Sequence, residues 1–242
     1  MSTNQGYVAS NFDVRTVRQG SWSTGKKRYV WVDLDGAVPF PVYVTKGGVV
    51  QNVGKFGGKV FQGDLCEYRT DGKIYLLKTF EVAEAVDNAS GTTLRLVRDE
   101  FHHVPNVGDI LMKAPTSLSG KGKATAIGVP EAKNVQIGGV DTDVWEITIA
   151  AGDFGALTKG DIMVEAASAG SSVQMLVQNP NTFVPDDKVF NYSPATGNED
   201  FEGARYSFTP VLHGVAWVNR MSKLPSCVDA INKSKVSGWF EL

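Results

Sequence analysis

The sequence predicts a mainly β protein, built as an antiparallel β-barrel or sandwich with few short helices. Three observations lead to this expectation. The apolar residues recur mostly with a period of two, as on strands with one buried face. Gly is frequent, with 26 in 242 residues, and 10 Pro accompany it, which favours tight turns. The candidate strands are short and separated by Gly, Pro, Asn and Asp, which is typical of barrels and sandwiches.

The clearest strand signals lie at residues 144–149 and 66–77. Residues 144–149 alternate apolar with polar side chains and place Trp145 on the apolar face, which predicts a half-buried strand. Residues 66–69 and 73–77 flank Thr70-Asp71-Gly72, and Asp-Gly between two alternating runs predicts a hairpin. Further strands are expected at residues 29–32, 42–45, 94–97, 172–177, 206–208 and 215–218.

Helix is expected at one place. Ser226 follows Pro225 and can cap a short helix that runs to Asn232, with Val228 and Ile231 on one face. Residues 80–86 fit a strand or a helix.

A Gly-Asp-aliphatic pattern occurs three times, as Gly63-Asp64-Leu65, Gly108-Asp109-Ile110 and Gly160-Asp161-Ile162. Gly tolerates positive φ, and Asp can accept a hydrogen bond from the backbone N–H two residues further on. The pattern therefore predicts a recurrent turn that leads into a strand.

The charges divide the chain unevenly. Residues 1–30 hold five Lys and Arg against Asp13, which gives this segment a charge of +4. Because the net charge of the whole chain is -2, residues 31–242 carry a charge of -6. We expect residues 1–20 to form a basic, extended N-terminal arm that orders on a partner. Residues 21–242 form a β-rich body of one domain, or of two with a boundary within the loop-rich, acidic segment 179–203.

Composition excludes several classes of function. The net charge of -2 provides no bulk positive field for nucleic acid, and no apolar run is long enough to span a membrane. Cys66 and Cys227 lack the spacing of a metal or redox site, and the N-terminus has no apolar leader. We expect both thiols to be reduced, as in a reducing compartment.

Few residues indicate catalysis. His102 and His103 follow Asp99 and Glu100, but adjacent residues of a strand point to opposite faces, so a hydrated strand end is favoured over a metal site. An enzyme would need His213 or His102 beside a nucleophile or carboxylate in a pocket. No catalytic or phosphate-binding motif is present. We therefore expect no enzyme, catalytic residue, cofactor or metal.

Four segments carry a resemblance to a known family. They are TTLRLVRDEFHHVPNVGDILMKAP at 92–115, VWEITIAAGDFGALTKGDIMVEA at 144–166, LVQNPNTFVPDD at 176–187, and the ending from residue 214. Over roughly residues 60–242 the chain resembles the auxiliary capsid proteins of tailed bacteriophages, the head decoration or head-fibre proteins. The resemblance implies β-rich domains docked on the outside of the capsid, often as trimers. The chain has no heptad run for a fibrous shaft, which favours a compact protein on the capsid surface.

The resulting prediction is a structural virion protein that is made in the host bacterial cytoplasm and binds the major capsid protein on the outer surface of an assembled capsid. We expect a homo-oligomer, with a trimer as one candidate. The residues expected to contact the capsid lie in the N-terminal segment: Asn4, Tyr7, Phe12, Arg15, Arg18 and Trp22. The alternative is a module that binds a host-surface glycan, for which exposed aromatic residues would be needed.

Overall fold

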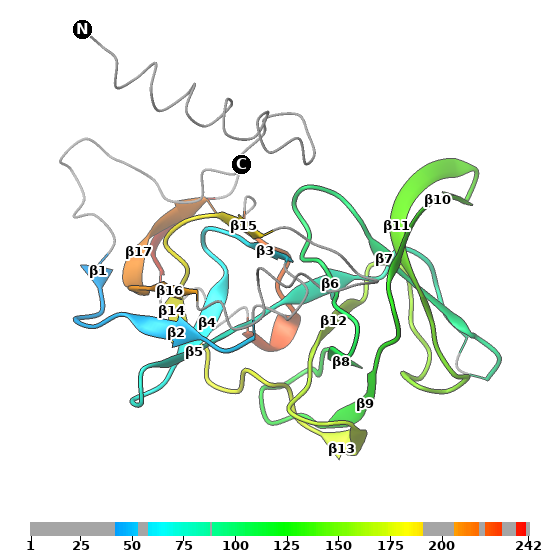
Figure 1. The fold of residues 1–242 in the computed structure, drawn as a ribbon, viewed down its shortest axis with the longest axis horizontal. Helices are drawn as coiled ribbons and strands as arrows, with labels where there is room; N and C mark the ends of the chain where they lie inside the picture. The colour runs from blue at the N-terminus through cyan, green and yellow to red at the C-terminus, as the bar shows by residue number, and fades with distance from the viewer. Residues whose placement is uncertain are drawn as a thin grey trace, which may run out of the picture.

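The computed structural model describes residues 42–52, 58–87, 89–190, 206–217, 221–228 and 236–240. It is mainly β, with curled antiparallel and mixed sheets that form a half-barrel (Figure 1), and this confirms the predicted fold class. Within these ranges, helix occurs at residues 226–228 alone. These residues begin the helix expected after Pro225, and its continuation to residue 232 lies outside the described ranges.

The largest sheet has eight strands in the order β1-β17-β14-β4-β5-β2-β16, with β18 paired to β17. The pairs β2–β5 and β17–β18 are parallel, and the other pairs are antiparallel. The strands are β1 Val42–Tyr43, β2 Gly48–Val50, β4 Leu65–Tyr68, β5 Lys73–Leu76, β14 Thr182–Phe183, β16 Ser207–Phe208, β17 Val211–Trp217 and β18 Val236–Phe240.

A second sheet has five antiparallel strands in the order β13-β9-β8-β12-β6, and β3 and β15 form a two-stranded ladder. The strands are β3 Gly58–Val60, β6 Thr79–Glu81, β8 Ile110–Lys113, β9 Gly122–Ala126, β12 Ile162–Glu165, β13 Gly170–Val173 and β15 Lys188–Phe190. A third sheet has the order β10-β11-β7, with β7 Thr93–Val97, β10 Glu131–Ile137 and β11 Val140–Thr148.

Three apolar clusters form the core between these sheets. One joins the large sheet to the five-stranded sheet around Met112 and Phe183. The second lies between the five-stranded and three-stranded sheets and contains Phe80, Leu96 and Trp145. The third lies against the large sheet around Ile74. The period-two alternation explains these clusters, because it places every second side chain of a strand on the face that the next sheet covers.

Most of the strand predictions that can be compared are confirmed. The 66–77 hairpin is β4–β5; Gly72 lies at its tip with φ 80°, and the Arg69 N–H donates to the Lys73 carbonyl at 2.9 Å. Residues 80–86 begin as strand β6 and continue through a bridge between Val82 and Leu96. The strand expected at 172–177 was wrong in extent: β13 ends at Val173, because the chain then leaves β9. The strand expected at 29–32 lies outside the described ranges.

The Gly-Asp pattern marks a recurrent turn, as predicted. In each copy the Asp N–H donates to the carbonyl of the residue three positions earlier. The Asp carboxylate accepts the N–H of that same residue, and not the expected N–H two residues further on. The preceding Gly63, Gly108 and Gly160 have φ of 81°, 84° and 87°, which favours glycine over any residue with a Cβ. A fourth copy joins Ala150 and Asp153. It was not predicted because the pattern requires an aliphatic residue after Asp, and this copy has Phe154 there.

The three predicted copies also dock alike. In each copy, the Gly N–H donates to the backbone carbonyl of a residue on a neighbouring strand or loop, and the N–H of that residue donates to the Asp backbone carbonyl. The docking residue is Val184 for the first copy, Ile127 for the second and Val82 for the third. Each turn is therefore held at both ends by backbone bonds, which makes the scaffold rigid.

Candidate interaction surface

Two features outside the ordinary core could carry a function: a set of buried charged residues in the body, and a β-hairpin that projects from it. The buried set centres on Asp64. Its Oδ2 accepts the Phe61 N–H at 2.7 Å and lies 2.8 Å from His103 Nε2, and its Oδ1 accepts the Ser222 hydroxyl at 2.5 Å. His103 is 1% exposed. The strand end predicted to be hydrated is therefore wrong for His103, whose ring packs edge-on against Phe61 at 5.2 Å.

The order of these groups decides their chemistry. A carboxylate can only accept, so the bond to Asp64 assigns a proton to His103 Nε2, and Nδ1 then accepts the Thr79 N–H at 3.2 Å. The serine hydroxyl donates to the carboxylate. The three contacts of Asp64 hold the first Gly-Asp turn in place.

Lys78 is the buried partner of the second Gly-Asp turn. It is 3% exposed, and its Nζ lies 2.7 Å from Glu165 Oε1 and 3.6 Å from Asp109 Oδ2. Burial lowers the pKa of Lys78, but the charges of Asp109 and Glu165 outweigh burial and leave the pKa raised. Burial raises the pKa of Glu165, whose Oε2 accepts a hydrogen bond from Asn52 at 2.5 Å. The buried charges of Lys78 and Glu165 therefore face each other within the protein.

The projecting feature is the hairpin of β10 and β11, which extends from the body at the opposite end from β1 (Figure 1). We call residues 131–148 the arm from here on, and residues 1–22 the N-terminal segment. None of the seven β10 residues is buried, and on β11 burial begins at Val144. Trp145 and Ile147 then anchor the base of the arm against Leu96 and Leu94 of β7. The arm thus has a buried root and a solvent-exposed outer half.

A two-residue turn at Gly138 and Gly139 closes the arm. Their φ values are 61° and 83°, and positive φ at both positions defines the type I′ turn that matches the twist of a hairpin. A Cβ at either glycine would meet no neighbouring atom, so the backbone conformation rather than space requires glycine here. The register is continuous from Ile137–Val140 to Glu131–Glu146.

The outer edge of β10 presents free backbone groups. β10 is the end strand of its sheet, and in a two-residue hairpin the pair next to the turn, Ile137 and Val140, is hydrogen-bonded. Because antiparallel pairing alternates, the N–H and C=O groups of Ala132, Asn134 and Gln136 point away from β11. Within the described ranges no strand pairs with this edge. Such an edge is a template for an additional strand.

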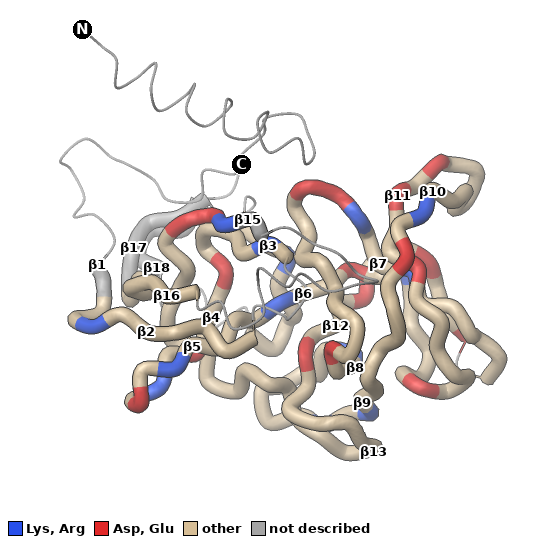
Figure 2. The backbone as a smooth tube through the Cα atoms, viewed as in Figure 1, with Lys and Arg blue, Asp and Glu red and all other residues tan. Residues whose placement is uncertain are grey.

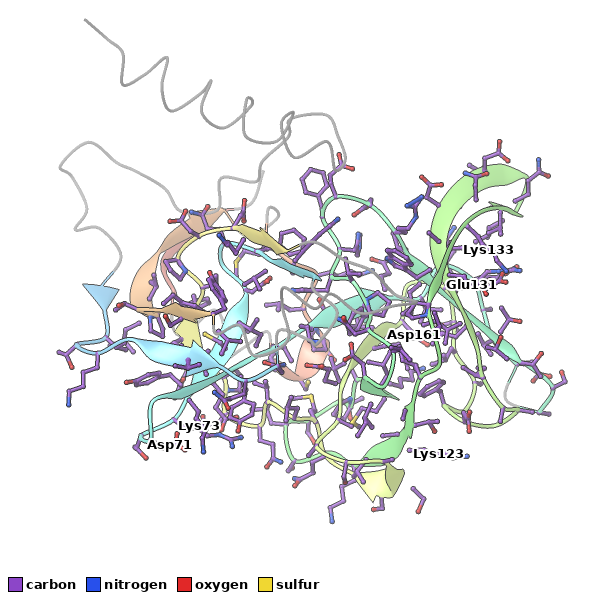
Figure 3. All side chains as sticks on the ribbon, viewed as in Figure 1. Asp71, Lys73, Lys123, Glu131, Lys133 and Asp161 are labelled. Atoms are coloured by element: carbon purple, nitrogen blue, oxygen red, sulfur yellow. The ribbon has the colours of Figure 1, made fainter. Side chains whose placement is uncertain are left out.

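A charge ladder crosses one face of the arm. Lys133 Nζ lies 2.6 Å from Glu146 Oε1 and 3.0 Å from Glu131 Oε2, and Arg95 Nε of β7 lies 2.9 Å from Glu146 Oε2 (Figure 3). Arg95 also pairs with Glu84. The hydrogen bonds from Lys133 and Arg95 hold the pKa of Glu146 below its usual value. Lys133, which could otherwise discourage strand addition, is thus held by two carboxylates.

The arm as a whole is acidic and carries exposed apolar side chains. Residues 131–148 contain four Asp and Glu against Lys133, a net charge of -3, visible as red segments in Figure 2. Val140 is 65% exposed, and Val129, just before β10, is 45% exposed. Val135 and Ile137 are half-buried on the same face as Val140. An acidic, partly apolar strand edge favours a basic partner segment with apolar residues.

The residues predicted to contact a capsid, from Asn4 to Trp22, lie outside the described ranges.

The other two histidines considered for catalysis are His102 and His213. His102 Nδ1 lies 2.7 Å from Asp99 Oδ1, and His102 Nε2 lies 3.6 Å from Glu81 Oε2. Burial raises the pKa of Asp99, but the bond to His102 and neighbouring positive charge outweigh it and leave that pKa lowered. Of His213 the structure describes the backbone in β17. In the described part of the chain, no group of three His, Cys, Asp or Glu residues could hold a metal ion.

The hairpin that forms the arm was not predicted, although the strand expected at residues 144–149 lies at its base. Gly138-Gly139 separates Glu131–Ile137 from Val140–Thr148, and Gly-Gly between two such runs is a recognised hairpin signal. The polar composition of residues 131–137 concealed the strand, because its alternation of polar with apolar residues is limited to residues 134–137.

Comparison of the chain with protein-family models, with curated proteins and with solved structures found no match. Among the helices that the structure describes, none has the length and apolar character of a membrane span.

Proposed function

We propose that this chain is a structural virion protein, which binds the outer surface of an assembled tailed-phage capsid and stabilises or decorates it. The observation that carries the proposal is the arm, which offers a free strand edge and exposed Val140 to another chain. The rigid turns of the body support it, because a scaffold that keeps its shape loses little entropy when it binds.

In this proposal the N-terminal segment and the arm have different tasks. The basic N-terminal segment contacts the major capsid protein through Asn4, Tyr7, Phe12, Arg15, Arg18 and Trp22. The arm, which lies at the opposite end of the body from β1 (Figure 1), contacts a neighbouring copy on the shell. Each bound copy stabilises the assembled state by mass action, and many weak contacts repeated over a shell act together.

Co-sedimentation with empty capsids of the phage that carries this chain tests the proposal. The full chain is expected to pellet with the capsids, and a chain without residues 1–20 to stay in the supernatant. Arg15→Gln/Arg18→Gln is expected to weaken binding at least tenfold at low salt, and raised salt to weaken binding of the unmodified chain. The matched control, Lys121→Gln/Lys123→Gln, removes the same charge from the body and should bind normally.

Two results would overturn the proposal. The first is a full chain that does not sediment with capsids at low salt. The second is equal binding by the Arg15→Gln/Arg18→Gln variant and its control, which would remove the role of the N-terminal segment.

A further inference from the structure

We propose that the free edge of β10 receives residues 26–32 of a second copy of this chain as an added strand, so that copies associate head to tail. This inference names the partner of the arm, and it rests on the proposed function only in taking the arm as the contact between neighbouring copies.

The β10 edge is suited to strand addition. It presents the backbone groups of Ala132, Asn134 and Gln136, and its register with β11 has no bulge. Natural sheets protect exposed edges with Pro, bulges or free Lys. Within β10 no Pro occurs, and its one Lys, Lys133, contacts Glu131 and Glu146. The edge thus lacks the usual protection and can bind an extended segment through its main chain.

Charge decides which segment fits. Two arms would each bring a net charge of -3, so direct pairing of β10 with β10 of another copy places like charges together. Residues 26–32 have the opposite character. Lys26, Lys27 and Arg28 carry three positive charges with no acidic residue among the seven, which complements the arm.

The same segment also has the pattern of a strand. Residues 29–32 read Tyr-Val-Trp-Val, all residues of high β propensity. On one face of the arm, Val135, Ile137 and Val140 are partly or largely exposed. The apolar half of the segment can cover this face while its basic half meets the acidic residues.

The length of the connection between residue 32 and residue 42 indicates that the segment belongs to a second copy. β1 begins at Val42, and it lies at the opposite end of the long axis from the arm (Figure 1). The ten steps from residue 32 to residue 42 span at most about 35 Å. A globular chain of this length has a diameter of about 45 Å. The connection must also run over the surface, so a segment cannot reach the arm of its own copy. Head-to-tail contacts of this kind close into rings or extend into chains.

Photo-crosslinking of the full-length chain without capsids tests the contact directly. p-Benzoylphenylalanine replaces Asn134 on the free edge, and in the control variant it replaces Thr142 on β11, away from the edge. Equal amounts of isotopically light and heavy chain are mixed before irradiation. We expect Asn134 to crosslink to residues 26–32 in pairs of mixed label, at least fivefold more than Thr142 does. Crosslinks between two β10 strands, crosslinks within one copy, or equal yield at both positions would each refute the proposal.

A charge reversal provides a second test. Lys26→Glu/Lys27→Glu/Arg28→Glu is expected to weaken self-association at least tenfold in analytical ultracentrifugation at low salt. Arg15→Glu/Arg18→Glu, which alters the proposed capsid contact, should associate normally. If both variants associate like the unmodified chain, the arm does not receive this segment, although capsid binding can still hold. If the first variant loses self-association but the full chain does not bind capsids, the strand addition stands and the capsid proposal fails.

Discussion

The carboxylate of Asp64 should contribute far more to stability than the carboxylate of Asp153, although both residues occupy the same type of turn. Asp64 accepts hydrogen bonds from three buried donors, on Phe61, His103 and Ser222. Asp153 accepts one, from the Ala150 N–H at the surface. Asp64→Ala and Asp153→Ala remove the same atoms, so the difference between them isolates the buried network.

The expected magnitudes follow from the donors that each substitution leaves unpaired. A buried donor that loses its partner costs about 1–3 kcal/mol, and Asp64→Ala removes the carboxylate from three buried donors. We therefore expect Asp64→Ala to lower the free energy of unfolding by about 4 kcal/mol or more. Water can replace the surface bond of Asp153, so Asp153→Ala should cost about 1 kcal/mol.

Urea unfolding measures this difference. With a slope of about 3 kcal/mol per molar urea for a chain of this size, Asp64→Ala should lower the midpoint by more than 1 M and Asp153→Ala by about 0.3 M. Should Asp64→Ala fail to fold, Ser222→Ala removes a single donor of the same network and is expected to cost about 1–2 kcal/mol. Equal midpoints for Asp64→Ala and Asp153→Ala would show that the buried contacts contribute nothing beyond an ordinary turn.

Three further predictions follow from single features. Gly139→Ala should cost about 1–2 kcal/mol because its φ of 83° is strained for a residue with a Cβ; faster amide exchange in the arm alone, without a change in the body, is the expected readout. The lowered pKa of Glu146 means that its pairing with Lys133 stabilises the arm above pH 4.5 and that this stabilisation is lost as the pH falls through the lowered pKa; an NMR titration that places the Glu146 pKa at or above 4.5 would contradict this. Burial raises the pKa of Cys66 to about 12, so iodoacetamide at pH 8 should label Cys227 first and Cys66 only after unfolding in urea, as mass spectrometry of the labelled peptides can determine.

Local features of the fold could be predicted because the bonds that form them are local. The Gly-Asp turns close through bonds between residues three apart, for example Asn106 and Asp109, and a short motif contains both partners. The hairpin at Gly72 is of the same kind. The arm follows similar rules through Gly138 and Gly139, but its outer half is mostly polar, and its alternation on β10 is shorter than the one that identified residues 144–149.

The sequence by itself determined the β class, the recurrent turns and the division between a basic N-terminal segment and an acidic remainder, because these depend on composition, periodicity and spacing. Tertiary structure alone decided which groups meet. Asp64 finds His103 39 residues away and Ser222 158 residues away, and one turn motif becomes a buried network there and a surface turn at Asp153. The physical reason is that burial and hydrogen-bond partners are set by which sheets pack together, and that packing sums many small apolar contacts distributed over the whole chain.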